Sequence, residues 1–438
     1  MTTTDPLTHS PAFGLPLAAM DPALADLLAQ EERRNLATVN LIASESYCPR
    51  STLEAEASLL VNKNAYGYPG ARGVAGCAVF DRIETLALER ACRLFGAERA
   101  NIQALSSTIA NIAVMRALVP PGGTILAFDE SAGGHHSHGA DYHLAGRDYR
   151  VVRFGADEAA GTLDLDAARR LAREHEPAVI VAGSTSFPRA IDFTALSGIA
   201  RETGARLFAD IAHVSGLVAA GLLPSPASCA DVVTTSTHKT FCGPRTGGLI
   251  LSQADIADAI DRELFPGLQG APGAHIVAAR AALFHFAGTA EFRGLMAAIL
   301  RNAAALADVL SRAGMTLYLG GTDTHMVVVD LRHTAIDALE LERTCERHGL
   351  MANRVSLPSR PGDVSRAGLR LGTTAMSIRG IGPQDLAALG EIVGALIDLE
   401  PGRDDAGLRE RIAGIARRCP IPEAFLPHWF SRPDARPA

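Results

Sequence analysis

The chain has 438 residues, too many for one compact hydrophobic core, so we expect two domains or one large domain with appendages. A hydrophobic share of 47% is typical of a globular protein, and a net charge of −7 gives no reason to expect nucleic acid or an anionic membrane as a partner. Seven scattered cysteines without a Cys-x-x-Cys spacing argue against a disulfide framework and a zinc ribbon, and favour the reducing cytoplasm.

The first third of the chain contains an arm, two helices and one long loop. Residues 1 to about 20 show no periodicity, so we expect a loose arm. A helix is predicted from Asp21, a good N-cap, to Asn35. The glycine-rich stretch 64–77 predicts a loop whose length favours a function. A second helix is predicted to run from Asp81 until Gly96 stops it. No stretch reads as a secretion signal or a membrane span.

Strand and helix patterns then alternate along the chain. The predicted strands are 124–128, 178–182, 206–209, 231–234 and 248–251, and the predicted helices between them are 165–174 and 193–203. Continuous apolar runs of this length are typical of parallel strands buried on both faces of a sheet. The sequence therefore predicts an α/β fold with a mostly parallel sheet.

The pattern changes after about residue 290. A long helix is predicted over 295–313 and another over 383–399, with two strands between them at 326–330 and 369–372. These elements predict a small α+β domain. We expect an N-terminal arm and helix over 1–45, a large domain over 46–288 and a small C-terminal domain over 289–438.

Only two lysines occur, Lys63 and Lys239, and arginine carries nearly all other positive charge. A desolvated lysine amine loses its proton and attacks carbonyl groups, whereas a guanidinium does not. Lys239 follows a predicted strand, at the edge where open α/β sheets bind ligands. We predict that Lys239 forms a Schiff base with pyridoxal 5'-phosphate (PLP). The alternative is a surface lysine without a function, and this is our interpretation of Lys63.

A PLP site also needs an anion cradle, an acid for the ring nitrogen and a flat group against the ring. Ser106, Ser107 and Thr108 open a predicted helix and offer donors for a phosphate, although an ordinary N-cap also explains them. Asp210 ends a predicted strand and would pair with the pyridinium; the alternative is a buried aspartate that caps a loop. The histidine-rich loop 133–138 offers an imidazole for stacking. We favour stacking over a metal site, because no carboxylate or thiolate nearby in sequence completes a ligand set.

Several motifs then follow one another in a specific order. They are Asn40-Leu-Ile-Ala-Ser-Glu45, Gly67-Tyr-Pro-Gly70, Gly133-Gly-His135, Asp210-Ile-Ala-His213, Thr237-His-Lys-Thr240 with Gly243-Pro-Arg245, and Gly372-Thr-Thr-Ala375 with Arg379-Gly380. Together they resemble the serine hydroxymethyltransferase family over roughly residues 20–430. The resemblance implies the fold type I, aspartate aminotransferase-like architecture of PLP enzymes. It also implies a homodimer with shared active sites, and leaves a tetramer open.

The resemblance implies a role for each candidate residue. Those implied to bind or act on PLP are Ser106, Ser107, Thr108, His135, Thr185, Asp210, His213, His238, Lys239 and, across the dimer, Gly270. Those implied to contact the substrate are Ser44, Asn64, Tyr66, Arg245 and Arg379. In this assignment His135 stacks on the ring, Arg379 and Ser44 bind the substrate carboxylate, and Tyr66 counts as catalytic. No metal is expected.

The sequence departs from the family in the positions that contact folate. Tyr66 stands where the family has Glu, Gly73 and Val74 stand where it has a Tyr pair, and Val355 stands where Asn is usual. A phenol stays protonated at neutral pH and cannot replace a carboxylate base. Gly73 and Val74 lack the flat surface that a pteridine stacks on. We interpret these changes as a widened pocket that admits a bulky aldehyde.

The predicted function is therefore PLP-dependent cleavage or formation of the Cα–Cβ bond of a β-hydroxy amino acid, without folate. Threonine or serine would give a glycine quinonoid, which takes a proton in an aldolase or attacks an aldehyde in a threonine transaldolase of specialised metabolism. One alternative is a genuine serine hydroxymethyltransferase, which converts serine and tetrahydrofolate to glycine and methylenetetrahydrofolate. Others are different PLP chemistry on this scaffold, or a catalytically silent PLP-binding partner of a related enzyme.

Overall fold

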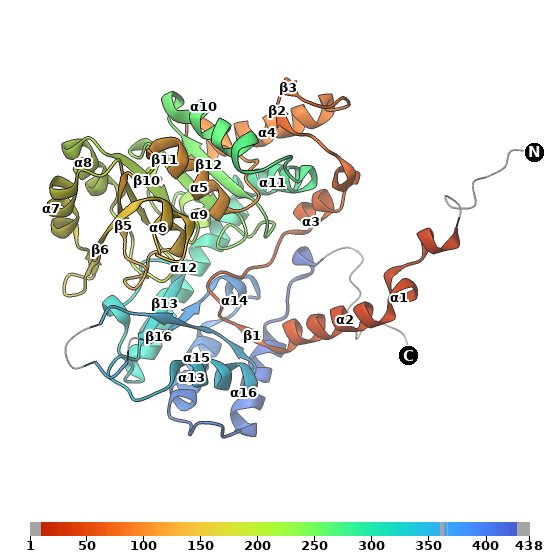
Figure 1. Cartoon of the computed structure of the whole chain (residues 1–438). Helices are drawn as coiled ribbons and strands as arrows, with labels where there is room; N and C mark the ends of the chain where they lie inside the picture. The colour runs from red at the N-terminus through yellow and green to blue at the C-terminus, as the bar shows by residue number, and fades with distance from the viewer. Residues whose placement is uncertain (1–9, 360–362, 366, 427–438) are drawn as a thin grey trace, which may run out of the picture.

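The centre of the molecule is a seven-stranded sheet with the strand order β4-β12-β11-β10-β9-β5-β6. The computed structural model in Figure 1 describes residues 10–359, 363–365 and 367–426. Strands β11, β10, β9, β5 and β6 run parallel, and β12 is antiparallel to both of its neighbours. The predicted α/β fold with a mostly parallel sheet is confirmed. The strands are β4 (Arg99–Asn101), β5 (Thr124–Phe128), β6 (Arg150–Phe154), β9 (Val179–Gly183), β10 (Arg206–Asp210), β11 (Val232–Ser236) and β12 (Gly248–Ser252).

The two strands that the sequence did not predict, β4 and β6, lie at the two edges of this sheet. β4 has only three residues, and β6 reads Arg-Val-Val-Arg-Phe, with arginines that stay exposed. An edge strand is not buried on both faces, so it lacks the continuous apolar run that identified the five inner strands.

Alternate residues of each inner strand enter the hydrophobic cores on the two faces of the sheet. Leu207 and Val233 point to one core and Phe208 and Val232 to the other. The helices over the first core are α4 (Ala78–Phe95), α7 (Leu165–His175), α8 (Phe193–Thr203) and α11 (Ala274–Ala287), and those over the second are α5 (Ser107–Leu118) and α10 (Ala254–Arg262).

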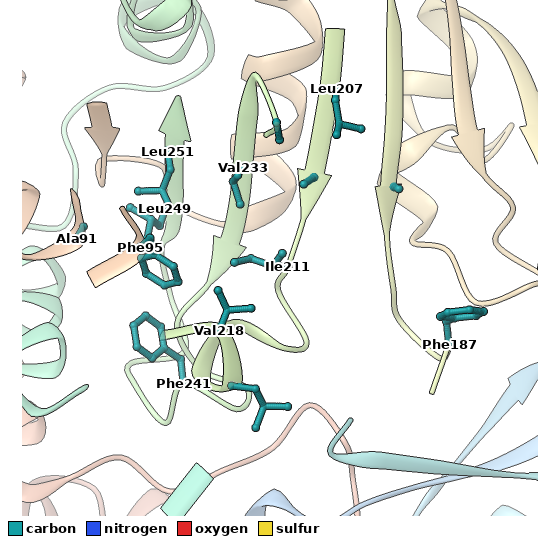
Figure 2. Packing of buried hydrophobic residues seen from close by; sticks show 14 of the residues in the cluster. Ala91, Phe95, Phe187, Leu207, Ile211, Val218, Val233, Phe241, Leu249 and Leu251 are labelled. Carbon is teal, nitrogen blue, oxygen red and sulfur yellow. The ribbon is translucent and has the colours of Figure 1, made fainter. Parts of the chain in front are cut away.

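Figure 2 shows part of the first core, where aromatic rings fill the space beneath the strands. Phe95 at the end of α4 meets Phe241 edge to face, with ring centroids 5.7 Å apart. Helix α4 ends there because Gly96 adopts a left-handed conformation with φ of 70°, as the sequence predicted for this glycine. Phe241 follows Lys239 by two residues, so this packing anchors the loop that carries the lysine.

A smaller antiparallel sheet has the order β13-β16-β15 and its own hydrophobic core. Its strands are β13 (Met326–Asp330), β15 (Asn353–Ser356) and β16 (Ala367–Gly372), and its helices include α13 (Ala338–Arg347), α15 (Pro383–Ile397) and α16 (Ala406–Arg418). Helix α12 (Ala290–Arg312) joins the two halves, because Phe292 lies in the first core and Leu306 in that of the small sheet. The predicted boundaries at residues 45 and 288 stay a prediction.

Among the described residues, α12 is the one helix with the length and hydropathy that a membrane span requires. Its buried side chains belong to both cores, which is what a long central helix of a folded protein needs. The length and hydropathy of α12 are therefore explained by its packing against both protein cores.

The N-terminal segment is less loose than predicted. Asp21 caps α2 (Pro22–Ala37) by accepting from the N–H of Leu24 at 3.0 Å. Residues 11–14 and 17–20 form helical turns, so the expectation of a loose arm was wrong there, and residues 1–9 lie outside the described part. The arm extends away from the rest of the molecule in Figure 1.

After α2 the chain returns to the small sheet. Strand β1 (Val39–Asn40) pairs in parallel with β14 (Leu350–Met351), and the N–H of Gly372 donates to the Leu41 carbonyl at 2.7 Å. A Cβ on Gly372 would lie 2.3 Å from the Ala43 Cα, so only glycine lets the two backbones approach this closely. The contact brings Ser44 beside the end of β16.

Candidate active site

Polar residues gather at the carboxyl ends of four neighbouring parallel strands. β5 leads into the histidine-rich loop that ends at His138, β9 leads to Thr185, β10 ends at Asp210, and β11 leads to Lys239. Because β5, β9, β10 and β11 are adjacent and parallel, their carboxyl ends lie along one edge of the sheet. The topology therefore brings together four segments that are far apart in the sequence.

Asp210 is the buried anion of this group. Its Oδ2 accepts from Asn111 Nδ2 at 2.8 Å and lies 3.0 Å from His138 Nε2, while its Oδ1 accepts from the Ala212 N–H at 2.9 Å. Burial by itself raises the pKa of Asp210, but the hydrogen bond to His138 and the nearby positive charge of Lys239 outweigh it and hold that pKa well below its usual range. The side chain is therefore an ionised carboxylate.

Lys239 is buried in the loop after β11. Burial lowers the pKa of its amine to about 8; Asp210 opposes this shift, and the charges of Arg370 and Arg245 add to it. The loop is held by Thr240, whose hydroxyl donates to the His213 carbonyl at 2.8 Å, and by the Gly243 N–H, which donates to the Thr237 carbonyl at 2.7 Å. At pH 7 about a tenth of this amine is neutral and nucleophilic, far more than for a lysine with an ordinary pKa.

Three imidazoles of the site, those of His135, His213 and His238, are neutral because burial lowers the pKa of each. Burial lowers the pKa of His135 to about 2 and that of His238 to about 3, and it places the pKa of His213 well below its ordinary value. His213 stacks on His325, with ring centroids 5.5 Å apart, and His325 Nε2 lies 3.1 Å from the Ala43 carbonyl. The His213–His325 pair thus connects the large sheet to the segment that carries Ser44.

Arg379 does not have the role that the sequence analysis assigned to it. Its guanidinium donates all five of its N–H groups to backbone carbonyls, those of Asn35, Leu36, Thr38, Ala416 and Cys419. No donor remains for a substrate carboxylate. Arg379 instead ties the end of α2 to the end of α16, and the prediction that it binds substrate was wrong.

Arg370, and not Arg379, is the buried arginine near Lys239. It is buried in β16, and its charge contributes to the lowered pKa values of Lys239 and His213. Nε donates to Asn353 Oδ1 at 3.1 Å and Nη1 donates to the Thr185 carbonyl. Within the described part of the chain its Nη2 has no hydrogen-bond partner, so donors remain for an anion.

The group fits a phosphorylated aldehyde with a pyridine ring. Ser106 caps α5, accepting from the Ile109 N–H at 3.1 Å, and the first turn of a helix leaves further N–H groups for a phosphate. Several buried side-chain atoms at these strand ends have no hydrogen-bond partner among the described residues: Thr185 Oγ1, His138 Nδ1, Ser236 Oγ and His238 Nδ1. Such orphaned polar groups at a nucleophilic amine suit a polar cofactor.

Three other residues that were predicted to belong to the active site, Tyr66, Asn64 and Gly270, have their contacts elsewhere in the chain. Tyr66 donates its hydroxyl to the Gly73 carbonyl at 2.8 Å, and its ring is 6.2 Å from that of Phe265. The hairpin that follows, β2 (Gly67–Tyr68) and β3 (Ala71–Arg72), lies beside α4 and α10 in Figure 1. Asn64 and Gly270 also make no recorded contact with the Lys239 group.

Gly73 does not widen a pocket. A Cβ at residue 73 would lie 1.9 Å from Tyr66 Cε2, so the ring of Tyr66 occupies the space that a side chain at 73 would need. Val74 and Val355 pack against the first core. In the described structure, the space at Gly73, Val74 and Val355 is therefore occupied by other side chains. The interpretation of a widened pocket was wrong.

The histidine-rich loop also lies beside a carboxylate. Ligand atoms of His135, His138 and Asp210 all lie within 4.8 Å of one another. The absence of a carboxylate nearby in sequence was thus no argument against a metal, because Asp210 arrives from another strand. Two of these three residues, His135 and Asp210, are those expected to hold the pyridine ring, and the expectation that no metal binds stays a prediction.

The sequence analysis missed Asn111, His138, His325 and Arg370. Arg370 had a usable signal, because it stands between Leu369 and Leu371 on a strand expected to be buried, where an unpaired charge is costly. The other three lacked one. Asn111 lies within a helix, and the partners that orient the two histidines are distant in sequence.

Comparison with known proteins gives a consistent result. The sequence profile of the family described as "Serine hydroxymethyltransferase" matches residues 17–393. A Myxococcus xanthus protein named serine hydroxymethyltransferase is 42% identical over 399 residues, which cover 91% of this chain and 94% of the relative. Proteins of the same name from Mycobacterium avium and Leifsonia xyli are 42% and 41% identical, over 94% and 98% of this chain and 98% and 99% of their own lengths.

These relatives contradict the predicted folate-independent threonine transaldolase or aldolase. Proteins 41–42% identical over nearly the whole chain are all named serine hydroxymethyltransferase. The prediction depended on Tyr66, interpreted as the loss of a carboxylate base, and on Gly73, Val74 and Val355, interpreted as a widened folate pocket. The Tyr66 ring occupies the space beside Gly73, so the interpretation of a widened pocket had no structural basis.

Arg379→Lys should lower the free energy of unfolding by about 3 kcal/mol or more, because each buried carbonyl left without a donor costs roughly 1–3 kcal/mol. Urea denaturation measures the change. Arg370→Lys is the matched control, since it loses two recorded hydrogen bonds in place of five and should destabilise the protein less. Equal stability of the Arg379 variant and the wild type would contradict the structural role.

The amine of Lys239 in cofactor-free protein should become reactive with a midpoint near pH 8, because the neutral form predominates above its pKa. Reductive methylation between pH 6 and pH 11, followed by peptide mass spectrometry, measures this. Lys63 reports reagent consumption in the same tube. A Lys239 that stays unmodified until above pH 10 would show that burial does not shift the amine.

Proposed function

The chain belongs to the serine hydroxymethyltransferase family of PLP-dependent enzymes, and we propose that it transfers the hydroxymethyl group of serine to tetrahydrofolate. The products are glycine and methylenetetrahydrofolate. The names of the relatives support this activity. The observation that carries it is the buried amine of Lys239, with its lowered pKa, beside the ionised Asp210 at the edge of the sheet.

The residues at the strand ends hold the cofactor. Lys239 would hold its aldehyde, the carboxylate of Asp210 would pair with the ring nitrogen, and the neutral imidazole of His135 would supply a flat partner for the ring. The hydrogen bonds from Asn111 and the Ala212 N–H fix the Asp210 carboxylate in place. PLP when bound withdraws electrons from the α-carbon of the amino acid, which weakens the bonds to that carbon.

The phosphate is bound at the start of α5. Ser106, Ser107 and Thr108 supply hydroxyl and backbone donors there, and the positive end of the helix dipole favours the anion. Thr185 and His238 border the ring, because each has a buried polar atom without a partner among the described residues.

The substrate carboxylate is bound by Arg370 together with Ser44. Arg370 is oriented by the Thr185 carbonyl and by Asn353, and its Nη2 faces no partner within the described chain. A guanidinium holds a carboxylate in a defined orientation, so Arg370 would determine how the amino acid lies in the site. Arg245 is exposed at the same loop and adds positive charge beside Lys239.

Proton handling falls to groups that are neutral near pH 7. His213 cannot carry a charge at this pH, because burial and the charges of Lys239 and Arg370 hold its pKa low. It donates or accepts a single hydrogen bond in a tautomer set by its neighbour His325. Lys239, with a pKa of about 8, is the group whose protonation changes near neutrality.

The active enzyme is a cytoplasmic homodimer. Helix α2 buries none of its residues, and Leu17, Met20, Leu24, Leu27 and Leu28 are exposed along an arm that extends from the molecule (Figure 1). Leu59 and Val61, just before Asn64, are also exposed. Exposed apolar surface of this extent is typical of a protein interface, and a second copy of the chain buries it.

Asn64, Tyr66 and Gly270 then contact the active site of the partner. The seven free cysteines suit the reducing cytoplasm.

The decisive assay is serine cleavage with and without tetrahydrofolate. We expect glycine formation that requires both PLP and tetrahydrofolate, loss of activity in Lys239→Arg, and full activity in the matched variant Lys63→Arg. Arg370→Lys should raise KM for serine by about 100-fold, because a two-pronged guanidinium contact is replaced by a point charge. Acetaldehyde release from threonine without any folate-dependent turnover of serine would refute the proposal.

Replacing Leu27 and Leu28 by Glu should dissociate the dimer, because two buried charges would have no partner in the interface. Analytical ultracentrifugation measures the mass in solution. Gln30→Glu, which adds a charge to the same helix at an exposed polar position, is the control and should remain a dimer. A wild-type chain that sediments as a monomer would rule out shared active sites.

A further inference from the structure

A small cavity of about 30 Å³ lies beside the start of α11. Its walls are the segment 102–105, the residues Thr246 and Gly247, the first turn of α11 and the side chain of Arg280. Lys239, Asp210 and Arg370 are not among its lining residues. The proposed reaction assigns no role to this cavity.

The guanidinium of Arg280 forms part of the wall and is fully buried. Its Nη1 donates to the Ile102 carbonyl at 2.6 Å, and a Cβ on Gly247 would lie 3.0 Å from the same Nη1. Both Ile102 and Gly247 line the cavity, which places the guanidinium at its surface. The Nε and Nη2 groups are buried and have no hydrogen-bond partner among the residues that the structure describes.

No protein carboxylate within the described chain pairs directly with this charge. Burial lowers the pKa of Arg280 to about 9, and the charge of Glu84 opposes that shift through space. Glu84, however, accepts from Gln103 Nε2 at 2.7 Å through one oxygen and from Arg72 through the other. A buried charge whose donors are unpaired is costly, so a binding partner is expected at the Nε and Nη2 groups.

The first turn of α11 adds a second set of donors. Its N-cap, Gly273, has no side chain to accept a hydrogen bond, and the first backbone bond inside the helix is from the Val277 N–H to the Gly273 carbonyl. The earlier N–H groups of a helix have no intrahelical acceptor and carry the positive end of the helix dipole. Two independent features, a buried guanidinium and an uncapped helix start, border one cavity.

We propose that this cavity binds one monovalent inorganic anion of the size of chloride. A water molecule requires roughly 10–15 Å³ of such a volume, so the cavity admits one monatomic ion and is too small for an organic anion or a second cofactor. One guanidinium and one helix N-terminus balance a single negative charge.

The bound anion stabilises the segment that leads to the proposed phosphate site. The Gly247 N–H donates to the Leu105 carbonyl at 3.0 Å, and Leu105 directly precedes Ser106, the N-cap of α5. An ion that holds Arg280 and the start of α11 therefore supports the wall from which α5 begins. This inference concerns a site separate from the substrate pocket and does not depend on the identity of the reaction.

Crystals of the wild-type holoenzyme grown in sodium bromide test the site directly. The expected result is an anomalous bromide peak within hydrogen-bond distance of Arg280 Nη2 or Nε. A water molecule there, or an oxygen atom from a second copy of the chain, would overturn the proposal. This measurement needs no variant, so it decides the question even if changes at Arg280 impair folding.

Thermal unfolding of the holoenzyme gives a second readout. Replacing gluconate by chloride at constant ionic strength should raise Tm of the wild type by a few degrees, because a ligand of the folded state stabilises it. Arg280→Met should lose this response. Arg90→Met is the matched control and should keep it, since Arg90 also donates to a backbone carbonyl, that of Ala281, but does not line the cavity. An equal chloride response in all three proteins would overturn the proposal.

Discussion

The structure of the site depends on one balance: an amine and a carboxylate are buried together at the end of a parallel sheet. Burial alone would remove the charge from both groups. The carboxylate of Asp210 stays ionised because His138, Asn111 and a backbone N–H supply it with hydrogen bonds. Lys239 is then left with a pKa of about 8, set between the cost of burial and the attraction of Asp210.

Three buried arginines illustrate how tertiary contacts decide the role of a side chain. Arg379 uses all of its donors on backbone carbonyls and joins two helices. Arg370 uses two groups to fix its orientation and keeps others for a ligand. Arg280 has one protein partner and two unpaired groups beside a cavity. The number of donors that the protein itself satisfies separates a structural arginine from a binding one.

The loop around Tyr66 shows why neighbouring departures from a family's usual residues must be interpreted together. Taken singly, Gly73 loses an aromatic ring and Tyr66 loses a carboxylate. In the folded chain the Tyr66 ring lies over Gly73, and a side chain at residue 73 would collide with it. An aromatic ring from another position of the same loop therefore fills the space beside Gly73. A change of reaction inferred from each substitution separately was therefore not justified, and the whole-chain similarity points to the serine hydroxymethyltransferase family.

The amino-acid sequence by itself determined the inner strands, most long helices, the lysine and the aspartate of the site. These features depend on short-range physics: apolar runs predict buried strands, Asp21 and Gly96 set helix ends, and a lone lysine after a strand indicates a nucleophile. Only the tertiary structure decided between Arg370 and Arg379, paired His213 with His325, and filled the space over Gly73. Each of these depends on contacts between distant segments, whose distances and donor counts no local pattern in the sequence contains.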